Sequence, residues 1–326
     1  MWRRSLLTGL VLQAAPRAWL LQRLAQAWPG QPAGARFAAF FSGRVALQAI
    51  AREASFTRRV ALVPAYLCNV VALAFERAGW RVCEYAVDEA FVPDAAALRA
   101  HAQAEGADLL LLAPLYGSDG GLSQWLGPEA AAWRTRAGVA LVLDLCQDAA
   151  RLAQVTCSPG QRWAAVLSFN DKSFPGVMGG CLWSDLALAS PPAPPWRQRA
   201  LLAAWALRKC LPPRRASEPA AFEHSEATRF PYAFDTAGAS ALQLALGLTG
   251  MRHLPRWMAR RRSTVARGAV RPLTLPFAET APFVVAAAGD PGQHRRKPPY
   301  ALAHDATTSL RPQLNVRHNK GFDDSP

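Results

Sequence analysis

The sequence predicts a three-layer α/β/α protein built on a mostly parallel sheet. From about residue 37, short apolar runs alternate with segments of helical periodicity, which is typical of strands and helices that follow one another in an α/β domain. The chain has 326 residues, of which 51% are hydrophobic and 18% charged, so it can bury a large core. We therefore expect one large domain over residues 37–270, with a helical segment before it and a tail after it.

Residues 1–36 are expected to form an amphipathic helical segment. An apolar stretch from Leu6 to Leu12 is followed by large apolar residues at helical spacing, namely Trp19, Leu20, Leu24 and Trp28. A signal peptide is the alternative, but the apolar stretch is short and the pattern continues through Arg17 and Arg23, which favours a packed or interfacial helix. Contact of this helix with a membrane is the less favoured interpretation, and no stretch has the roughly 20 apolar residues of a membrane span.

Within the large domain, apolar runs predict strands at Val60 to Val63, Arg81 to Tyr85, Asp108 to Ala113, Val139 to Leu143, Ala164 to Phe169 and Gly180 to Trp183. Helical periodicity between them predicts helices at Gly43 to Ala54, Cys68 to Ala78 and Asp94 to Ala104. Periodicity fades after about residue 275. We therefore expect residues 271–326 to be a poorly ordered or truncated tail.

The net charge of +14 raises the question of nucleic-acid binding. Residues 251–326 hold 13 Lys or Arg against 5 Asp or Glu, yet no nucleic-acid module accompanies them, so we expect no nucleic-acid partner. The six cysteines lie mostly in apolar runs without the close pairing of metal ligands. This pattern is typical of reduced thiols in a cytoplasmic protein, with no disulfides and no bound metal.

Polar residues follow several of the predicted strands, at the edge where open α/β sheets bind ligands. Ser42 and Gly43 stand where a helix begins, so free N–H groups there could hold a phosphate, although an ordinary N-cap would have the same sequence. Asp144 follows a wholly apolar strand, where a carboxylate is costly unless it meets a cation. A protonated pyridine nitrogen would be such a partner, and a helix cap or an ion pair with an Arg is the alternative.

Lys172 is unusual because this chain rarely uses lysine. Its basic residues are 33 Arg and 4 Lys, and Lys172 is the only lysine before Lys209. Arg cannot lose its proton to become an amine nucleophile, so a lysine after a buried strand is a candidate to form an imine with an aldehyde cofactor. Gly176, Gly179 and Gly180 follow it and would let the backbone approach a cofactor closely. A solvated surface lysine is the alternative.

Six landmarks appear in the order seen in the DegT/StrS family of sugar aminotransferases. They are Ser-Gly-x-x-Ala-Leu at 42–47, Pro-Ala-Tyr at 64–66, Leu-Tyr-Gly at 115–117, Asp-x-x-Gln at 144–147, Ser-Phe at 168–169 followed by Lys172 and Gly-Gly, and Ala-Leu-Gly-Leu at 245–248. The chain resembles this family over about residues 37–265. The resemblance implies a pyridoxal-5'-phosphate-dependent transferase of fold type I, with a seven-stranded mixed sheet and an active site shared between two subunits.

The resemblance also implies a role for each site residue. Ser42, Gly43 and Arg44 would hold the cofactor phosphate together with Ser168, Asp144 would pair with the pyridine nitrogen, and Gln147 would lie against the ring. Lys172 would be the Schiff-base lysine and would carry a proton to and from the substrate. The amino group would pass from an amino acid, typically glutamate, to a keto sugar on a nucleotide. We expect a homodimer, to which the amphipathic N-terminal helix and Trp-rich segments offer apolar surface.

The chain departs from the family pattern in four places. Lys172 lies one residue closer to Ser168 than is usual, Cys68 stands where the family often has an aromatic ring, Thr236, Ala237 and Gly238 replace Asn-Tyr-Arg, and the C-terminal small domain is truncated or aberrant. A catalytically degraded relative that keeps the fold is therefore the alternative to an active transaminase. A dehydratase of the same fold is disfavoured, because such relatives typically have His at the lysine position.

Overall fold

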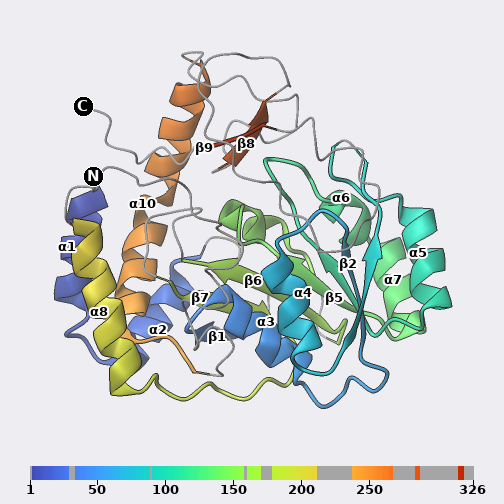
Figure 1. The fold of residues 1–326 in the computed structure, drawn as a ribbon, viewed down its shortest axis with the longest axis horizontal. Coiled ribbons are helices and arrows are strands. Elements are labelled where there is room, and N and C mark those ends of the chain that lie inside the picture. Colours follow the sequence, from blue (N-terminus) through green and yellow to red (C-terminus); the bar gives the residue numbers. More distant parts are fainter. Residues whose placement is uncertain are drawn as a thin grey trace.

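The computed structural model describes residues 2–28, 34–88, 90–157, 160–169, 178–210, 237–266, 283–286 and 315–318. Its centre is a seven-stranded sheet with the order β1-β7-β6-β5-β4-β2-β3 (Figure 1). The strands are β1 (Arg36–Phe40), β2 (Val60–Pro64), β3 (Arg81–Tyr85), β4 (Leu109–Leu112), β5 (Ala140–Asp144), β6 (Trp163–Ser168) and β7 (Gly180–Ser184).

Five neighbouring strands, from β3 to β6 in the sheet order, run parallel, whereas β7 pairs antiparallel with both β6 and β1. Because β1 and β6 are both antiparallel to β7, they run in the same direction as each other. The strands other than β7 therefore end at one edge of the sheet. The predicted, mostly parallel, seven-stranded sheet is confirmed.

Helices cover both faces of the sheet. One face packs against α3 (Gly43–Ala51) and α4 (Asn69–Glu76), and the other against α2 (Arg17–Gln26), α5 (Ala95–Ala104), α7 (Pro128–Ala137) and the first half of α10 (Ala241–Ala266). Alternate strand residues serve the two cores: Leu109 and Leu111 point to the first, Leu110 and Leu112 to the second. This arrangement is the three-layer α/β/α architecture that the sequence predicts.

The remaining elements lie at the margins of the sheet. They are α1 (Trp2–Leu12), α6 (Leu122–Trp125), the 3-10 helix η1 (Ala149–Gln154), α8 (Trp196–Cys210), and the antiparallel pair β8 (Phe283–Ala286) and β9 (Asn315–His318). The predicted N-terminal segment consists of two helices separated at Pro16, whose fixed φ and missing N–H suit the start of a helix. Much of the predicted tail, 271–326, lies outside the described residues. No described helix is long and apolar enough to cross a membrane.

Candidate functional site

The predicted site residues come from three strands that end at the same edge of the sheet. Ser42 and Gly43 follow β1, Asp144 is the last residue of β5, and Ser168 is the last residue of β6. Since β1, β5 and β6 run in one direction, their carboxyl ends carry these side chains to a common edge.

The N-terminus of α3 is held against β6 and β7 by backbone contact. The Ser42 hydroxyl caps the helix by accepting the N–H of Val45 at 3.3 Å, and Ser42 also forms an isolated parallel bridge with Gly179. A Cβ atom placed on Gly180 would lie 2.5 Å from the backbone nitrogen of Gly43 and 2.8 Å from its Cα. Glycine at 180 therefore allows the first turn of α3 to sit directly on β7.

Gly43 brings the same helix end next to the ends of β5 and β6. A Cβ on Gly43 would lie 3.1 Å from the Cys146 sulfur and 3.7 Å from Cβ of Ser168. The helix N-terminus, the β6 serine and the turn after Asp144 thus form one small region. The positive end of the helix dipole favours an anion there. Arg44, the third predicted phosphate ligand, is half-buried on the first turn of α3.

Asp144 and Gln147 are buried polar side chains on the turn that follows β5. Asp144 is 8% exposed, and its Oδ1 accepts the N–H of Cys146 at 3.0 Å. Gln147 is 7% exposed, and its buried Oε1 accepts no hydrogen bond from the residues that the structure describes. A buried carboxylate and an unsatisfied amide oxygen are both costly unless a further group meets them. The turn is therefore arranged to receive a polar ligand.

The described residues on either side of Lys172 lie beside this region. The N–H of Phe169 donates to the carbonyl of Gly179 at 2.9 Å, and the N–H of Gly179 donates to the carbonyl of Phe41 at 2.7 Å. Gly179 has φ +93°, and a Cβ there would lie 2.7 Å from the Phe169 ring. Lys172 itself lies outside the described residues, so its position stays a prediction. Both ends of its segment are fixed next to Ser42.

Comparison with known proteins identifies the fold. No protein-family model and no curated sequence matches the chain. Among solved structures, the Helicobacter pylori PseC, an aminotransferase involved in the biosynthesis of pseudoaminic acid, has a TM-score of 0.54 at 14% identity, over 87% of this chain and 74% of its own. DesI, solved in the presence of its TDP-sugar product, has a TM-score of 0.53 at 19% identity, over 87% of this chain and 65% of its own. For 3-amino-5-hydroxybenzoic acid synthase the TM-score is 0.50 at 16% identity, over 87% of this chain and 68% of its own.

The chain has the fold of the pyridoxal-phosphate-dependent aminotransferases. At these identities the likeness establishes the fold, and it confirms at that level the resemblance to DegT/StrS sugar aminotransferases seen in the sequence. The chain is shorter than these proteins: it spans 65% of DesI and 61% of S. venezuelae DesV.

In this aminotransferase fold, aromatic residues line the ends of β2 and β4. Tyr66, Phe91 and Tyr116 are buried, with ring centroids 5.2 to 6.2 Å apart. Burial raises the pKa of the Tyr66 hydroxyl, and the hydroxyl of Tyr116 partly offsets this rise. Tyr116 has φ +56°, a left-handed conformation that costs a non-glycine residue about 1 kcal/mol and is more often kept at functional sites. Tyr66 and Tyr116 belong to the sequence landmarks, whereas Phe91 carries no sequence signal of its own.

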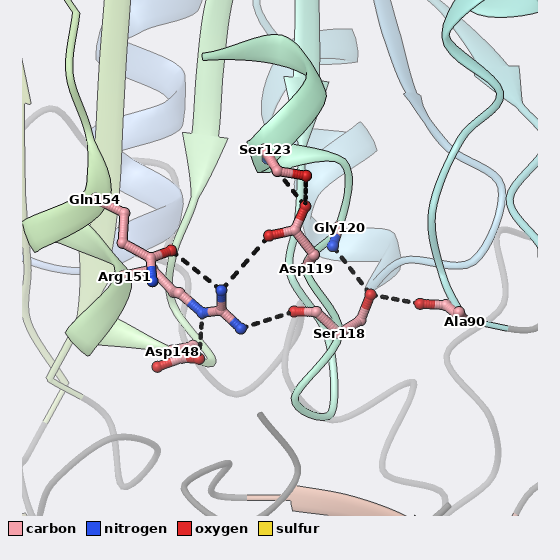
Figure 2. Close-up of polar contacts among 8 residues, drawn as sticks. All are labelled: Ala90, Ser118, Asp119, Gly120, Ser123, Asp148, Arg151 and Gln154. Carbon is pink, nitrogen blue, oxygen red and sulfur yellow. Dashed lines mark hydrogen bonds and ion pairs between the residues drawn. The ribbon is translucent and has the colours of Figure 1, made fainter. Parts of the chain in front are cut away.

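An ionic cluster around Arg151 was not predicted from the sequence. Figure 2 shows the Arg151 guanidinium surrounded by acceptors from two segments, the turn after β5 with η1 and the loop after β4. Nε donates to Asp148 at 3.0 Å, Nη1 to Gln154 at 3.1 Å and Nη2 to the Ser118 carbonyl at 3.2 Å, while Asp119 lies 3.6 Å from Nη1. Arg151 is 2% exposed, so these are desolvated, charge-assisted contacts.

The Arg151 cluster fastens the turn that carries Gln147 to the loop after β4. Ser118 holds that loop in turn, since its hydroxyl accepts the N–H of Gly120 at 2.9 Å and donates to the carbonyl of Ala90. Burial raises the pKa of Asp148, although Arg151 and Arg261 of α10 act against the rise. Burial lowers the pKa of Arg261 to about 10. One sequence signal could have indicated the cluster: Asp148 directly follows Gln147, and Arg151 comes three residues later among apolar residues.

Proposed function

We propose that this protein is a pyridoxal-5'-phosphate-dependent aminotransferase of the DegT/StrS type. It would transfer an amino group from an amino acid, glutamate, to a nucleotide-linked keto sugar in polysaccharide or secondary-metabolite biosynthesis. The observation that carries the proposal is that three features converge at one sheet edge of an aminotransferase fold: the N-terminus of α3, the buried carboxylate of Asp144, and the residues on either side of Lys172.

The described residues fit the cofactor. The N-terminus of α3 lies beside Ser42, Gly43 and Ser168, where the positive end of the helix dipole would favour a phosphate. The buried carboxylate of Asp144 suits a protonated ring nitrogen, and the amide of Gln147 still has an unused acceptor. When bound, the cofactor would supply an electron sink for the bond that breaks at the amino acid Cα.

Three residues of the chain would bind the cofactor or move a proton in the reaction. The Asp144 carboxylate would keep the ring nitrogen protonated, because an adjacent negative charge favours the charged form of a base. Lys172 would attach the cofactor through its Nζ and afterwards carry the proton from the substrate Cα. Arg44, on the first turn of α3, would add positive charge beside the phosphate.

The substrate class is supported by the proteins that share the fold. PseC acts in pseudoaminic acid biosynthesis, and DesI was solved with its TDP-sugar product. We extend the same class to this chain, together with a homodimeric assembly that completes each site and a cytoplasmic location where nucleotide sugars are made.

Two measurements test the proposal in sequence. Addition of pyridoxal phosphate to the purified protein should give a visible absorption band, and addition of glutamate should then convert the spectrum to that of the aminated cofactor. A stable band that glutamate leaves unchanged would show a relative that binds the cofactor without turnover. A protein that produces no band at all would contradict the proposal as a whole.

A further inference from the structure

The end of the molecule formed by α1, α2, α8 and α10 has an unusual surface. These helices contact one another, with α1 and α2 on α10 and α8 beside α1, and Figure 1 shows them gathered at one end, away from α5 and α7. Among the residues that the structure describes, the exposed large hydrophobics are Leu7, Val11, Trp19, Trp196 and Leu207. All of them lie on α1, α2 or α8.

The exposed apolar residues form stripes rather than scattered points. On α8, Trp196, Ala200, Ala204 and Leu207 lie about one turn apart along a single face, and each is exposed. The opposite face of α8 is buried through Gln198, Leu202 and Ala206. α8 therefore exposes apolar side chains on a side where a surface helix in water carries mainly polar ones.

The helix α1 also exposes apolar side chains. Gly9 faces α10, because a Cβ atom there would collide with the side chain of Leu246. Leu7 and Val11 lie two residues to either side of Gly9, which places them on the opposite face of the helix. They are 59% and 76% exposed.

The four helices carry positive charge and no negative charge. None of α1, α2, α8 and α10 contains an Asp or Glu residue. The exposed arginines of these helices are Arg23 on α2, Arg197 and Arg199 on α8, and Arg252, Arg256 and Arg262 on α10. Two of them cover tryptophan rings, Arg23 over Trp19 at 5.5 Å and Arg197 over Trp196 at 5.6 Å.

We infer that this face, made by α1, α2 and α8 with the arginines of α10, docks the protein on an anionic phospholipid surface. Apolar side chains would enter the boundary between headgroups and acyl chains, while arginines pair with phosphates and tryptophans lie at the interface. The sequence alone disfavours membrane contact. Our inference rests on the exposure of Leu7, Val11 and the α8 stripe, which periodicity cannot show.

The charge of this face favours a lipid surface over a second copy of the chain or a nucleic acid as its partner. A symmetric dimer through this face would set the same patch against itself, so arginines would oppose arginines with no carboxylate on these helices to balance them. A nucleic acid would satisfy the arginines but would give Leu7, Val11 and Leu207 no apolar partner. An anionic lipid surface satisfies both features.

The test is sedimentation of the full chain with vesicles of phosphatidylcholine that contain about one third phosphatidylglycerol, compared with phosphatidylcholine alone. We expect binding to the anionic vesicles that weakens as salt is added. Trp196→Gln with Leu207→Gln should weaken it about tenfold, as should Arg197→Gln with Arg199→Gln. The matched control, Arg77→Gln with Arg136→Gln, removes two exposed charges outside this face and should bind as wild type does.

The substituted side chains are exposed, so the variants should keep the wild-type circular dichroism and melting temperature. Wild-type protein that stays in solution with anionic vesicles would overturn the inference. So would an apolar double variant that binds them unchanged. Light scattering in which that variant changes from dimer to monomer would assign the face to a subunit interface, and binding to DNA but not to vesicles would assign it to nucleic acid.

Discussion

Replacement of Gly180 by alanine tests the contact between α3 and β7 on which the proposed phosphate site depends. The new Cβ would lie 2.5 Å from the nitrogen of Gly43 and 2.8 Å from both its Cα and the carbonyl oxygen of Leu167, whereas ordinary contact begins near 3.4 Å. All of these atoms belong to the backbone, so no side-chain rotation relieves the overlap. The first turn of α3 or the end of β6 must move by several tenths of an ångström.

Overpacking of this kind costs about 1–3 kcal/mol, and we expect the upper value because backbone must shift. Urea denaturation of Gly180→Ala should show that loss, and the Kd for pyridoxal phosphate should rise on the order of tenfold, the equivalent of about 1.4 kcal/mol. Gly127→Ala is the control, since its Cβ would meet nothing closer than 3.9 Å, and it should cost less than about 1 kcal/mol. Unchanged stability and affinity in Gly180→Ala would refute the reasoning.

Three further substitutions separate chemistry from structure. Asp144→Asn keeps an oxygen for the N–H of Cys146, so the free energy of unfolding should change by less than about 1 kcal/mol. The rate of transamination should fall at least about a hundredfold, because the charge beside the ring nitrogen is lost. A variant with the wild-type rate would show that Asp144 has only a structural role. Arg151→Met leaves Asp148 buried without its nearest cation and should lower the free energy of unfolding in urea by about 3–5 kcal/mol. An Arg136→Met change at an exposed position should not reproduce this loss. Burial raises the pKa of Asp148, so the folded chain binds that proton more tightly than the unfolded chain. The stability that Asp148 contributes is therefore present below about pH 3.9 and is lost as the pH rises through the raised pKa. The difference in free energy of unfolding between wild type and Asp148→Asn should fall across that pH range. A difference that does not change with pH would contradict this prediction.

The parallel part of the fold could be predicted because each buried strand is a continuous apolar run. The structure has strands at each of the predicted runs, with β3 (Arg81–Tyr85) at the predicted bounds. The strand β1 did not stand out, since Arg36–Phe40 is only partly buried and contains two alanines. The direction of β7 could not be predicted from hydrophobic periodicity, because an antiparallel strand buried on both faces has the same apolar pattern as a parallel one.

The site could be predicted only as far as it depends on strand ends. Asp144 and Ser168 are the last residues of β5 and β6, so their common edge follows from parallel pairing. The closeness of Gly43 to Cys146 and of Arg151 to Ser118 depends on packing between segments far apart in the chain, which no local pattern encodes. The outward apolar face of α8 was missed for the same reason: periodicity shows that a helix is amphipathic but not which face its neighbours cover.

Covalent attachment of the cofactor is the most direct test of the central proposal. The full chain loaded with pyridoxal phosphate is reduced with borohydride, digested and mapped by mass spectrometry. The account predicts the label on Lys172, and its loss in Lys172→Arg, which keeps the positive charge and similar bulk but offers no neutral amine. Lys209→Arg is the matched control and should label as wild type does. Label on Lys209, or no label in protein that binds the cofactor, would contradict the account.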